Sequence, residues 1–408
     1  MRSILVLLHR WFGLATALFL FVAGATGAVI SWDHELDEWL NPHLYQARAE
    51  GQPLDALTLA ARLEAADPRL RVRYLPLHVE AGHSLLLMVD PKTDPASGKP
   101  HVLGFNQIAL DPVSGEVLGR REWGKVALDR ENLLPFLYKL HYSLHIPDAF
   151  GLPLGTLFMG IVAIVWVFDS LVALWIAFPN WAAWRQSFAF RWRTGGYRLV
   201  FDLHRSGGVW LFLLVLMLAV TSVSMNLREQ VMRPVVAWFS ELTPSPFASR
   251  TLSAQPIEPK LSAAQVLVLA QAEAQRRQLS TPAGGVFLSS EFGLYGVGLF
   301  EGDNSHGDGG LGNPWLYFDA QTGAPLGADV PGRGSAGDIF LQAMFPLHSG
   351  RILGVPGRVL ISFCGLAVAA FSVTGVMIWA KKRRARRPTL QRRGVATSLG
   401  QQAVKVRS

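Results

Sequence analysis

Four long apolar runs constrain the fold more than any other feature of this sequence. They cover about residues 11–31, 153–178, 208–226 and 357–380. Each is long enough to cross the roughly 30 Å of hydrocarbon in a lipid bilayer. Only 17% of the 408 residues are charged, against about 25% in ordinary soluble domains. The sequence therefore predicts a membrane protein whose spans pack as an α-helical four-helix bundle.

Basic residues indicate how these spans are oriented. The net charge is +8, and the excess gathers in residues 178–205 and in KKRRARR at 381–387. Both segments lie beside apolar runs, so we interpret them as cytoplasmic anchors and expect no nucleic-acid partner. With four spans both termini are then cytoplasmic, and the long segments between spans lie on the outer face. In a Gram-negative bacterium this describes a multi-pass inner-membrane protein with periplasmic lobes.

These patterns divide the chain into eight segments. Transmembrane helices are expected at 1–33, 146–178, 206–228 and 351–380. Soluble outer lobes are expected at 34–145 and 229–350, a basic cytoplasmic loop at 179–205, and a basic tail at 381–408. A cleavable signal peptide is the alternative for the first segment, because Arg2 precedes an apolar stretch that contains the small residues AGATGA.

The chain also repeats itself. HRWFGLATAL at His9 aligns with HRSGGVWLFL at His204, and HIPDAFGLP aligns with HSGRILGVP. Between them, QIALDPVSGEVLG aligns with WLYFDAQTGAPLG, and both patterns predict a strand, a tight turn and a strand. Three blocks in the same order indicate two pseudo-symmetric copies of a unit made of helix, β-containing lobe and helix. A signal peptide has no reason to recur within a chain, so we expect the first span to remain.

The repeat places four histidines in equivalent positions. His9 and His204 lie at the cytoplasmic ends of spans one and three, while His145 and His348 lie at the outer ends of spans two and four. If the two copies pack together, each pair faces across the bundle, as the two axial ligands of a six-coordinate b-type haem do. The single cysteine, Cys364, excludes the CxxCH attachment of c-type haem. We therefore predict two non-covalent, bis-His b-type haems, with interfacial helix-capping histidines as the alternative.

Residues beside the inner histidines fit such pockets. Gly13 and Gly208 each follow a histidine by four positions. They therefore share its helix face and leave flat space for a porphyrin. Arg10 and Arg205 directly follow the same histidines, and we expect them to pair with haem propionates near the interface.

Two further residues belong to the predicted sites. His141 lies one helical turn before His145 in LHYSLH, so either residue is the candidate outer ligand opposite His348. Asp169, in WVFDSLVALW, is a charge within a span, and such charges are costly and usually functional. It should reach the depth of the inner histidines, where its carboxylate would accept the second ring N–H of a ligand. A structural hydrogen bond to Ser, Thr or Trp is the alternative.

Two polar segments carry weaker signals. WDHELDE at 32–38 is interpreted as the solvated start of a helix beside the membrane, with an approach to a metal ion as the alternative. EGDNSHGDGG at 301–310 is interpreted as a flexible loop, with contact to substrate as the alternative. The GDGGLG within this region matches GxGxxG, but Asn313 and Pro314 follow where a helix should begin, so we expect no nucleotide site.

These residues resemble the PepSY-associated transmembrane family, and in particular its branch of inner-membrane ferric-siderophore reductases. The shared motifs are HRWFGL with TGA, LHYSLH, WVFD before an exit at Pro179, LHSGRILGVPGR with TGVMIW, and two D-x-x-[ST]-G-x-x-[LG] hairpins. The resemblance covers nearly the whole chain. It implies four spans, two periplasmic α+β PepSY-like lobes, two b haems and electron transfer to an iron chelate outside.

The functional hypothesis is a di-haem b reductase of the inner membrane. It would take electrons from a donor in the cytoplasm or membrane, move them outward and reduce an Fe(III)-siderophore, which loosens the chelate because hard oxygen donors favour the more highly charged ion. Two alternatives remain open. One is a non-redox PepSY membrane module that binds or regulates a periplasmic protein, and the other is a b-type cytochrome that feeds a periplasmic enzyme.

Overall fold

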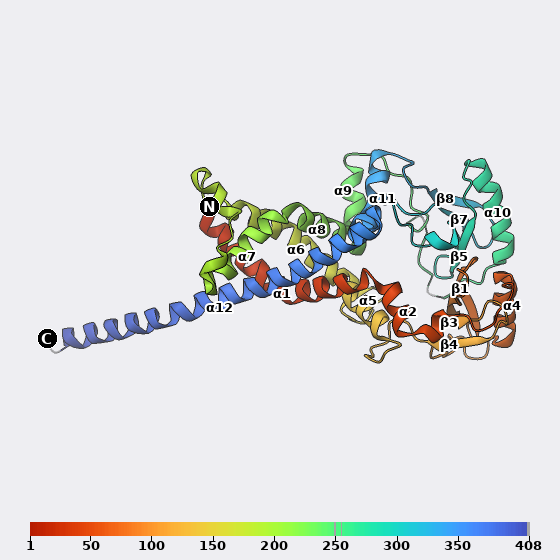
Figure 1. Cartoon of the computed structure of the whole chain (residues 1–408), viewed down its shortest axis with the longest axis horizontal. Helices are drawn as coiled ribbons and strands as arrows, with labels where there is room; N and C mark the ends of the chain where they lie inside the picture. The colour runs from red at the N-terminus through yellow and green to blue at the C-terminus, as the bar shows by residue number, and fades with distance from the viewer. Residues whose placement is uncertain (249, 254, 406–408) are drawn as a thin grey trace.

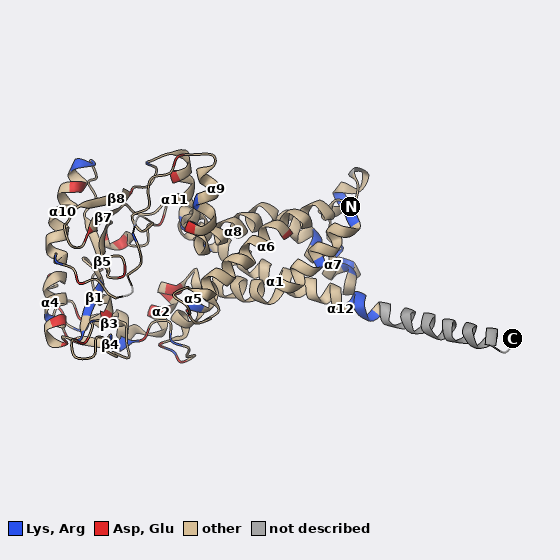
Figure 2. Cartoon of the chain, turned by 180° about the vertical axis from the view of Figure 1, so that it is seen from behind, with Lys and Arg blue, Asp and Glu red and all other residues tan. Residues whose placement is uncertain are grey.

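The computed structural model describes residues 1–248, 250–253 and 255–405, and it separates a group of long helices from a single β-sheet (Figure 1). The two parts lie at opposite ends of the molecule. Lys and Arg residues gather at the end of the helices that lies away from the sheet (Figure 2). This arrangement has the polarity that the basic segments of the sequence predict.

Among the described residues, three helices are long and apolar enough to cross a membrane, and two further helices together make a fourth candidate. The three are α1 (Arg2–Ile30), α6 (Leu154–Ala177) and the first part of α12 (Val355–Lys405). The fourth candidate is α7 (Gly196–Trp210) followed by α8 (Phe212–Asn226), with a bend of 72° between them. The single continuous span expected at 206–228 is therefore broken at Leu211. The N-terminal part, α7, carries Asp202, His204 and Arg205, whereas α8 is mainly apolar.

The long helices pack closely where glycine allows their backbones to meet. α1 packs against both α12 and α6, and α6 packs against α8. A Cβ added at Gly24 of α1 would lie 2.5 Å from the carbonyl oxygen of Gly365 in α12, and one at Gly365 would lie 2.6 Å from the oxygen of Gly24. Small residues at such crossings let membrane helices gain van der Waals contact, which replaces the hydrophobic driving force that lipid cannot supply.

The eight strands in the described part of the chain form one antiparallel sheet in the order β4-β3-β2-β1-β5-β6-β7-β8. The first four are β1 (Leu70–Pro76), β2 (Leu85–Pro91), β3 (Gln107–Leu110) and β4 (Val117–Arg121). The others are β5 (Ala283–Ser289), β6 (Leu294–Leu299), β7 (Trp315–Asp319) and β8 (Pro325–Asp329). The sequence predicted two separate lobes, but β1 pairs with β5, with Tyr74 opposite Phe287, and joins them. The pairing satisfies the backbone groups that would be exposed at an edge of each four-stranded half.

One helix from each copy covers this sheet. α4 (Ala56–Ala66) and α10 (Ala263–Arg276) bury Leu59 and Val266 in one apolar core that strands from both halves share. The predicted hairpins form as β3–β4 and β7–β8. In each turn an aspartate, Asp111 or Asp319, accepts hydrogen bonds from backbone N–H groups two and three residues later. The glycines at 115 and 323 then adopt φ values of +78° and +75°, a conformation that favours glycine.

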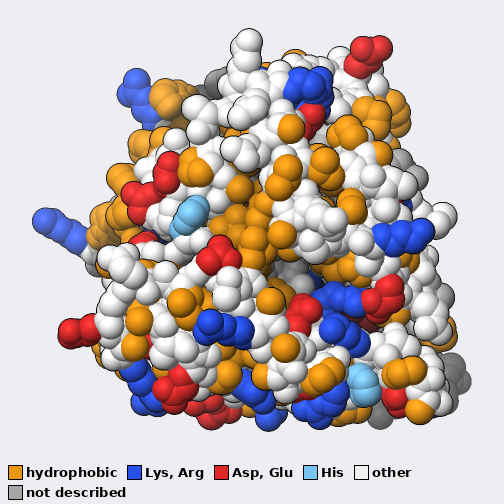
Figure 3. Space-filling view, turned by 90° about the vertical axis from the view of Figure 1, so that its right-hand side faces the viewer, with side chains coloured by type: hydrophobic (Ala, Val, Ile, Leu, Met, Phe, Trp, Pro, Cys, Tyr) orange, Lys and Arg blue, Asp and Glu red, His pale blue; other side chains and the backbone are white. Residues whose placement is uncertain are grey.

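Short helices connect the sheet with the spans. They are α2 (Asp33–Leu40), α3 (Pro42–Tyr45), α5 (Leu133–Ser143), α9 (Arg233–Ala237) and α11 (Ala336–Ser349). A buried ion pair fixes one of these connections, because the Arg121 guanidinium of β4 donates to the Asp37 carboxylate of α2 over 3.0 Å. The sheet end of the molecule is covered with interspersed acidic, basic and apolar side chains (Figure 3).

Candidate functional site

The inner histidine pair consists of His9 from α1 and His204 from α7. The ring centroids of His9 and His204 lie 6.0 Å apart, with the ring planes inclined by 46°. Each ring is held from behind by a different helix. His9 Nδ1 donates to Asp169 Oδ1 of α6 over 2.9 Å, and His204 Nδ1 lies 3.1 Å from Thr374 Oγ1 of α12. The structure therefore brings the two predicted inner ligands together, with Asp169 bound to one of them.

The outer pair consists of His141 from α5 and His348 from α11. Their ring centroids lie 6.1 Å apart, at an interplanar angle of 57°. His141 Nδ1 lies 3.1 Å from Thr26 Oγ1 and 2.9 Å from the carbonyl oxygen of Ala23, both in α1. His348 Nδ1 lies 3.0 Å from Thr221 Oγ1 of α8. This pair has the same construction as the inner one, with each ring supported by a neighbouring span.

The partners of these rings determine which nitrogen of each imidazole is free. Thr26, Thr221 and Thr374 each donate their hydroxyl hydrogen to a carbonyl of the preceding helical turn. Their oxygens are then acceptors toward the histidines, as the Asp169 carboxylate is for His9. All four Nδ1 atoms therefore carry the proton. Nε2 of each ring is left with a lone pair, which is the form in which histidine binds metals.

The spacing within both pairs suits two ligands on opposite sides of one iron. Metal–nitrogen bonds of about 2 Å, plus about 1 Å from each nitrogen to its ring centre, place two such centroids about 6 Å apart. Burial lowers the pKa of His141 to about 4 and that of His348 to about 3, so both imidazoles are neutral at pH 7. Neutral imidazole is the form that haem iron needs.

The glycines around the two histidine pairs also fit a haem at each pair. A Cβ at Gly27 would lie 2.9 Å from His141 Cε1, and one at Gly375 would lie 3.1 Å from His204 Cε1, so a side chain at either position would press on a histidine ring. Gly208 faces open space within 4 Å, and Gly13 has only Asp169 Oδ2 nearby, at 3.8 Å.

The Nε atoms of Arg10 and Arg205 are buried without a hydrogen-bond partner among the described residues. Arg10 lies over the ring of Trp11 and Arg205 over that of Phe201. Their unsatisfied Nε donors match acidic groups such as propionates, because buried polar atoms normally have partners. The residues present therefore fit a bis-imidazole haem.

His145 does not face His348. Helix α5 ends at Ser143, and Leu144 and His145 both have positive φ, at 54° and 55°. This turn directs the ring of His145 back along the chain, where it stacks on Phe136 at 4.6 Å and donates from Nε2 to the Phe136 carbonyl over 2.9 Å. Between the two outer candidates, the structure therefore places His141 opposite His348. The repeat spacing favoured His145, but the chain turns after His141 and carries the ring of His145 away from His348.

Sequence reasoning missed the three threonines. Their signal lies in the spacing, because Thr26 follows His9 at the same distance as Thr221 follows His204. A second signal is the pair Thr-Gly at 26–27 and again at 374–375, where the threonine binds a histidine and the glycine makes room for a ring. No local pattern predicts which histidine each threonine meets.

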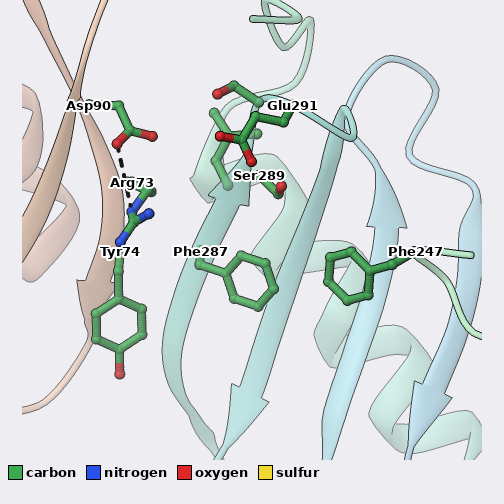
Figure 4. Close-up of a pocket in the computed structure, with 9 residues that line it drawn as sticks. Arg73, Tyr74, Asp90, Phe247, Phe287, Ser289 and Glu291 are labelled. Atoms are coloured by element: carbon green, nitrogen blue, oxygen red, sulfur yellow. Dashed lines mark ion pairs between the residues drawn. The ribbon is translucent and has the colours of Figure 1, made fainter. Parts of the chain in front are cut away.

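A separate cavity of about 300 Å³ lies on the sheet and is lined by Arg73, Tyr74, Asp90, Phe247 and Phe287. Arg73 and Asp90 form an ion pair at 3.7 Å, while the rings of Phe287 and Phe247 lie on the other side of the cavity (Figure 4). None of the predicted haem residues lines it. Within the described ranges, no three or more His, Cys, Asp or Glu side chains are grouped as a metal site.

Comparison with known proteins identifies the family. The model of the PepSY-associated TM region matches residues 6–382, which is nearly the whole chain. No curated protein matches the chain significantly. With its apolar helices and a family match of this length, the protein is a membrane protein that belongs to the family of the PepSY-associated TM region.

Proposed function

We propose that this protein is a di-haem b reductase of the bacterial inner membrane that moves electrons outward and reduces a ferric siderophore in the periplasm. The observation that supports it best is the presence of two histidine pairs of the same construction, His9 with His204 and His141 with His348. Both have Nε2 free for a metal. A single pair would suit many roles, whereas two pairs suit passage of electrons between them.

The positions of the pairs support transport across the bilayer. His9, of the inner pair, and Thr26, which binds the outer pair, lie on the same helix. The helical rise of about 1.5 Å per residue separates them by about 25 Å. This length approaches the thickness of the hydrocarbon region, of roughly 30 Å. The pairs therefore suit opposite faces of the membrane, with the outer one on the side of the sheet.

The protein's own residues would set up the redox chemistry. Haem iron bound at each pair would supply reversible one-electron oxidation and reduction. Two imidazoles at each site would hold the haem through protein side chains alone, which would favour electron transfer over binding of small ligands. Arg10 and Arg205 offer buried donors to propionates of the inner haem. Each Fe(III) chelate takes up one electron, and the Fe(II) that results is bound more weakly by hard oxygen donors.

Replacement of His204 tests the assignment of the ligands. His204→Ala should retain about half of the haem of the wild type, because the outer pair uses other residues, and the reduced spectrum should keep one set of sharp bis-His bands. His145→Ala is the matched control and should keep all of the haem, since the His145 ring binds a backbone carbonyl. Full haem content in His204→Ala would overturn the pairing, and absence of haem in the wild type would favour the non-redox PepSY module.

Sealed vesicles in which the sheet faces outward test the direction of electron transfer and the identity of the electron acceptor. A reductant confined to the lumen should reduce both haems, and an Fe(III)-siderophore added outside should reoxidise them while Fe(II) appears. His348→Ala should leave the inner haem reducible but slow this reoxidation. If wild-type haems are reduced yet no ferric chelate reoxidises them, the acceptor is a periplasmic protein and the siderophore assignment fails.

A further inference from the structure

A third histidine pair lies outside the spans. His34 is the second residue of α2, and His306 lies in the loop before β7, yet their ring centroids are 5.4 Å apart, with the planes inclined by 51°. Both residues are exposed. The sequence gives no reason to expect this meeting, because the two residues belong to different copies of the repeat.

The rings of this pair have little else to bind. His34 contacts Tyr45 edge-on at 5.6 Å, and its ring has no hydrogen-bond partner among the described residues. His306 Nδ1 lies 3.3 Å from Ser305 Oγ, a long hydrogen bond between neighbouring residues. His43 and His83 differ, because each has an Nε2 bound to a glutamate at 3.0 Å. The third pair therefore offers imidazole nitrogens to a ligand from outside.

Two ion pairs hold these rings in place. Arg351 binds Asp308 over 2.7 Å, and its carbonyl accepts from Gly309 N over 2.8 Å, which anchors the loop of His306. Arg358 binds Glu35 over 2.7 Å and the carbonyl of Ser31 over 2.8 Å, which anchors the start of α2 beside His34. The contacts made by the two guanidinium groups are charge-assisted and therefore stronger than neutral hydrogen bonds. The two segments thus keep the imidazoles facing each other.

The same contacts bring the third pair close to the outer haem residues. Arg351 follows His348 by three residues, and two residues separate Asp33 and His34 from the end of α1, whose Thr26 binds His141. Because these segments adjoin along the chain, we expect a chelate that reaches the outer pair from the side of the sheet to pass the rings of His34 and His306.

The separation of the rings distinguishes this pair from the haem pairs. Two imidazoles at a tetrahedral angle on one metal, with bonds of about 2 Å, have centroids about 5 Å apart, whereas ligands on opposite sides give about 6 Å. The 5.4 Å of His34 and His306 is nearer to the tetrahedral case. Imidazole suits Fe²⁺, Zn²⁺ and similar divalent ions better than it suits the hard Fe³⁺ ion.

We propose that His34 and His306 form a solvent-open site for a divalent transition-metal ion, with Fe²⁺ leaving the reduced chelate as its physiological occupant. Two protein ligands leave further positions to water or to oxygens of the chelate, as in sites that exchange their ligands. Metal binding rests on the geometry of the pair alone. The choice of Fe²⁺ as occupant rests on the proposed function.

Zn²⁺ titration of the full-length haem-loaded protein, followed by calorimetry, tests the site. The wild type should bind one Zn²⁺ that is lost, or weakened at least tenfold, in His34→Ala, in His306→Ala and in the double variant. His101→Ala is the control, because its side chain belongs to no histidine pair and should leave this binding unchanged. The haem spectrum of each variant shows that it has folded.

The outcomes separate the site from the proposed function. Unchanged Zn²⁺ binding in the double variant, or equal weakening by His101→Ala, overturns the site. If Zn²⁺ binding is lost as expected but no ferric siderophore reoxidises the wild-type haems, the divalent site stands and the reductase assignment fails. If the histidine variants lose Zn²⁺ and a ferric siderophore also reoxidises the wild-type haems, Fe²⁺ added without oxygen should compete with Zn²⁺ in the wild type. The double variant should not bind Fe²⁺ in this way. An absence of competition by Fe²⁺ overturns the assignment of its occupant.

Discussion

A single carboxylate distinguishes the inner histidine pair from the outer one. Of the four side chains that bind Nδ1 atoms, three are threonine hydroxyls and one is Asp169. A carboxylate makes its histidine more basic and a stronger electron donor to a metal. The inner site is therefore expected to have the lower reduction potential, which favours electron flow from the inner face to the outer one.

Asp169→Asn should raise the midpoint potential of the inner haem on the order of 60 mV, which is tenfold in the equilibrium constant of a one-electron couple. The amide still accepts from His9 Nδ1 but no longer carries a negative charge. Spectroscopic redox titration measures this change. Thr374→Ser retains the hydroxyl beside His204 and should leave the potential near its original value. An equal shift at both haems, or none at either, would contradict this role of Asp169.

At the scale of elements, the crossing of α1 and α12 organises both histidine pairs. α1 carries His9 and the Thr26 that binds His141, while α12 carries the Thr374 that binds His204. Their backbones meet at Gly24 and Gly365, where neither helix has space for a side chain. Displacement of one helix at this crossing therefore moves residues of both sites.

Gly24→Ala should destabilise the protein by about 1–3 kcal/mol, the usual effect of an added group in a packed core. It should also lower the content of both haems, because its Cβ would press on the backbone of α12. Thermal unfolding in detergent and the haem spectrum measure the two effects. Leu366 lies next to the crossing but on an exposed face of α12. Leu366→Ala should therefore change neither the stability nor the haem content much. If Gly24→Ala is as stable as the wild type, the two helices can move apart at this crossing without any loss of stability.

At the scale of the whole molecule, buried polar contacts join the sheet to the membrane helices. The Arg121 and Asp37 side chains are only 3% and 6% exposed, and they connect β4 with α2, which follows α1 directly. Removal of one partner leaves the other charge buried without compensation. The position of the sheet relative to the spans therefore depends on this pair.

Arg121→Ala should cost about 3–5 kcal/mol of stability, the range for a broken buried ion pair. Chemical unfolding monitored by tryptophan fluorescence measures the change. Arg69→Ala removes an arginine from an exposed pair with Asp67 and should have little effect, because solvent screens such charges. If the two variants lose equal stability, the Arg121 pair has no special role in holding the sheet.

The orientation of the whole molecule is open to direct test. Reporter fusions at Pro95 and Asp303 should be periplasmic, and fusions at Trp192 and after the last residue should be cytoplasmic, because basic segments stay inside. Alkaline phosphatase and fluorescent protein fusions report the two sides. A periplasmic C-terminus would require an odd number of spans and would contradict the model of two repeated units.

The sequence by itself determined the features that depend on local pattern. Apolar length predicted the membrane-crossing helices, the Asp-to-Gly turns predicted the β3–β4 and β7–β8 hairpins, and the repeat predicted that His9 and His204 correspond. Hydrophobic runs and turn residues act within a few positions of the chain, so they can be read without the fold.

Tertiary structure decided the contacts between distant segments. It joined the expected lobes into one sheet through β1 and β5, bent the third span after α7, and placed His141 rather than His145 opposite His348. It also brought His34 to His306 and a threonine to each of three histidines. These outcomes depend on how helices pack and strands pair across hundreds of residues. No residue carries that information in its immediate neighbours, because packing is settled by the whole set of surfaces that must be buried together.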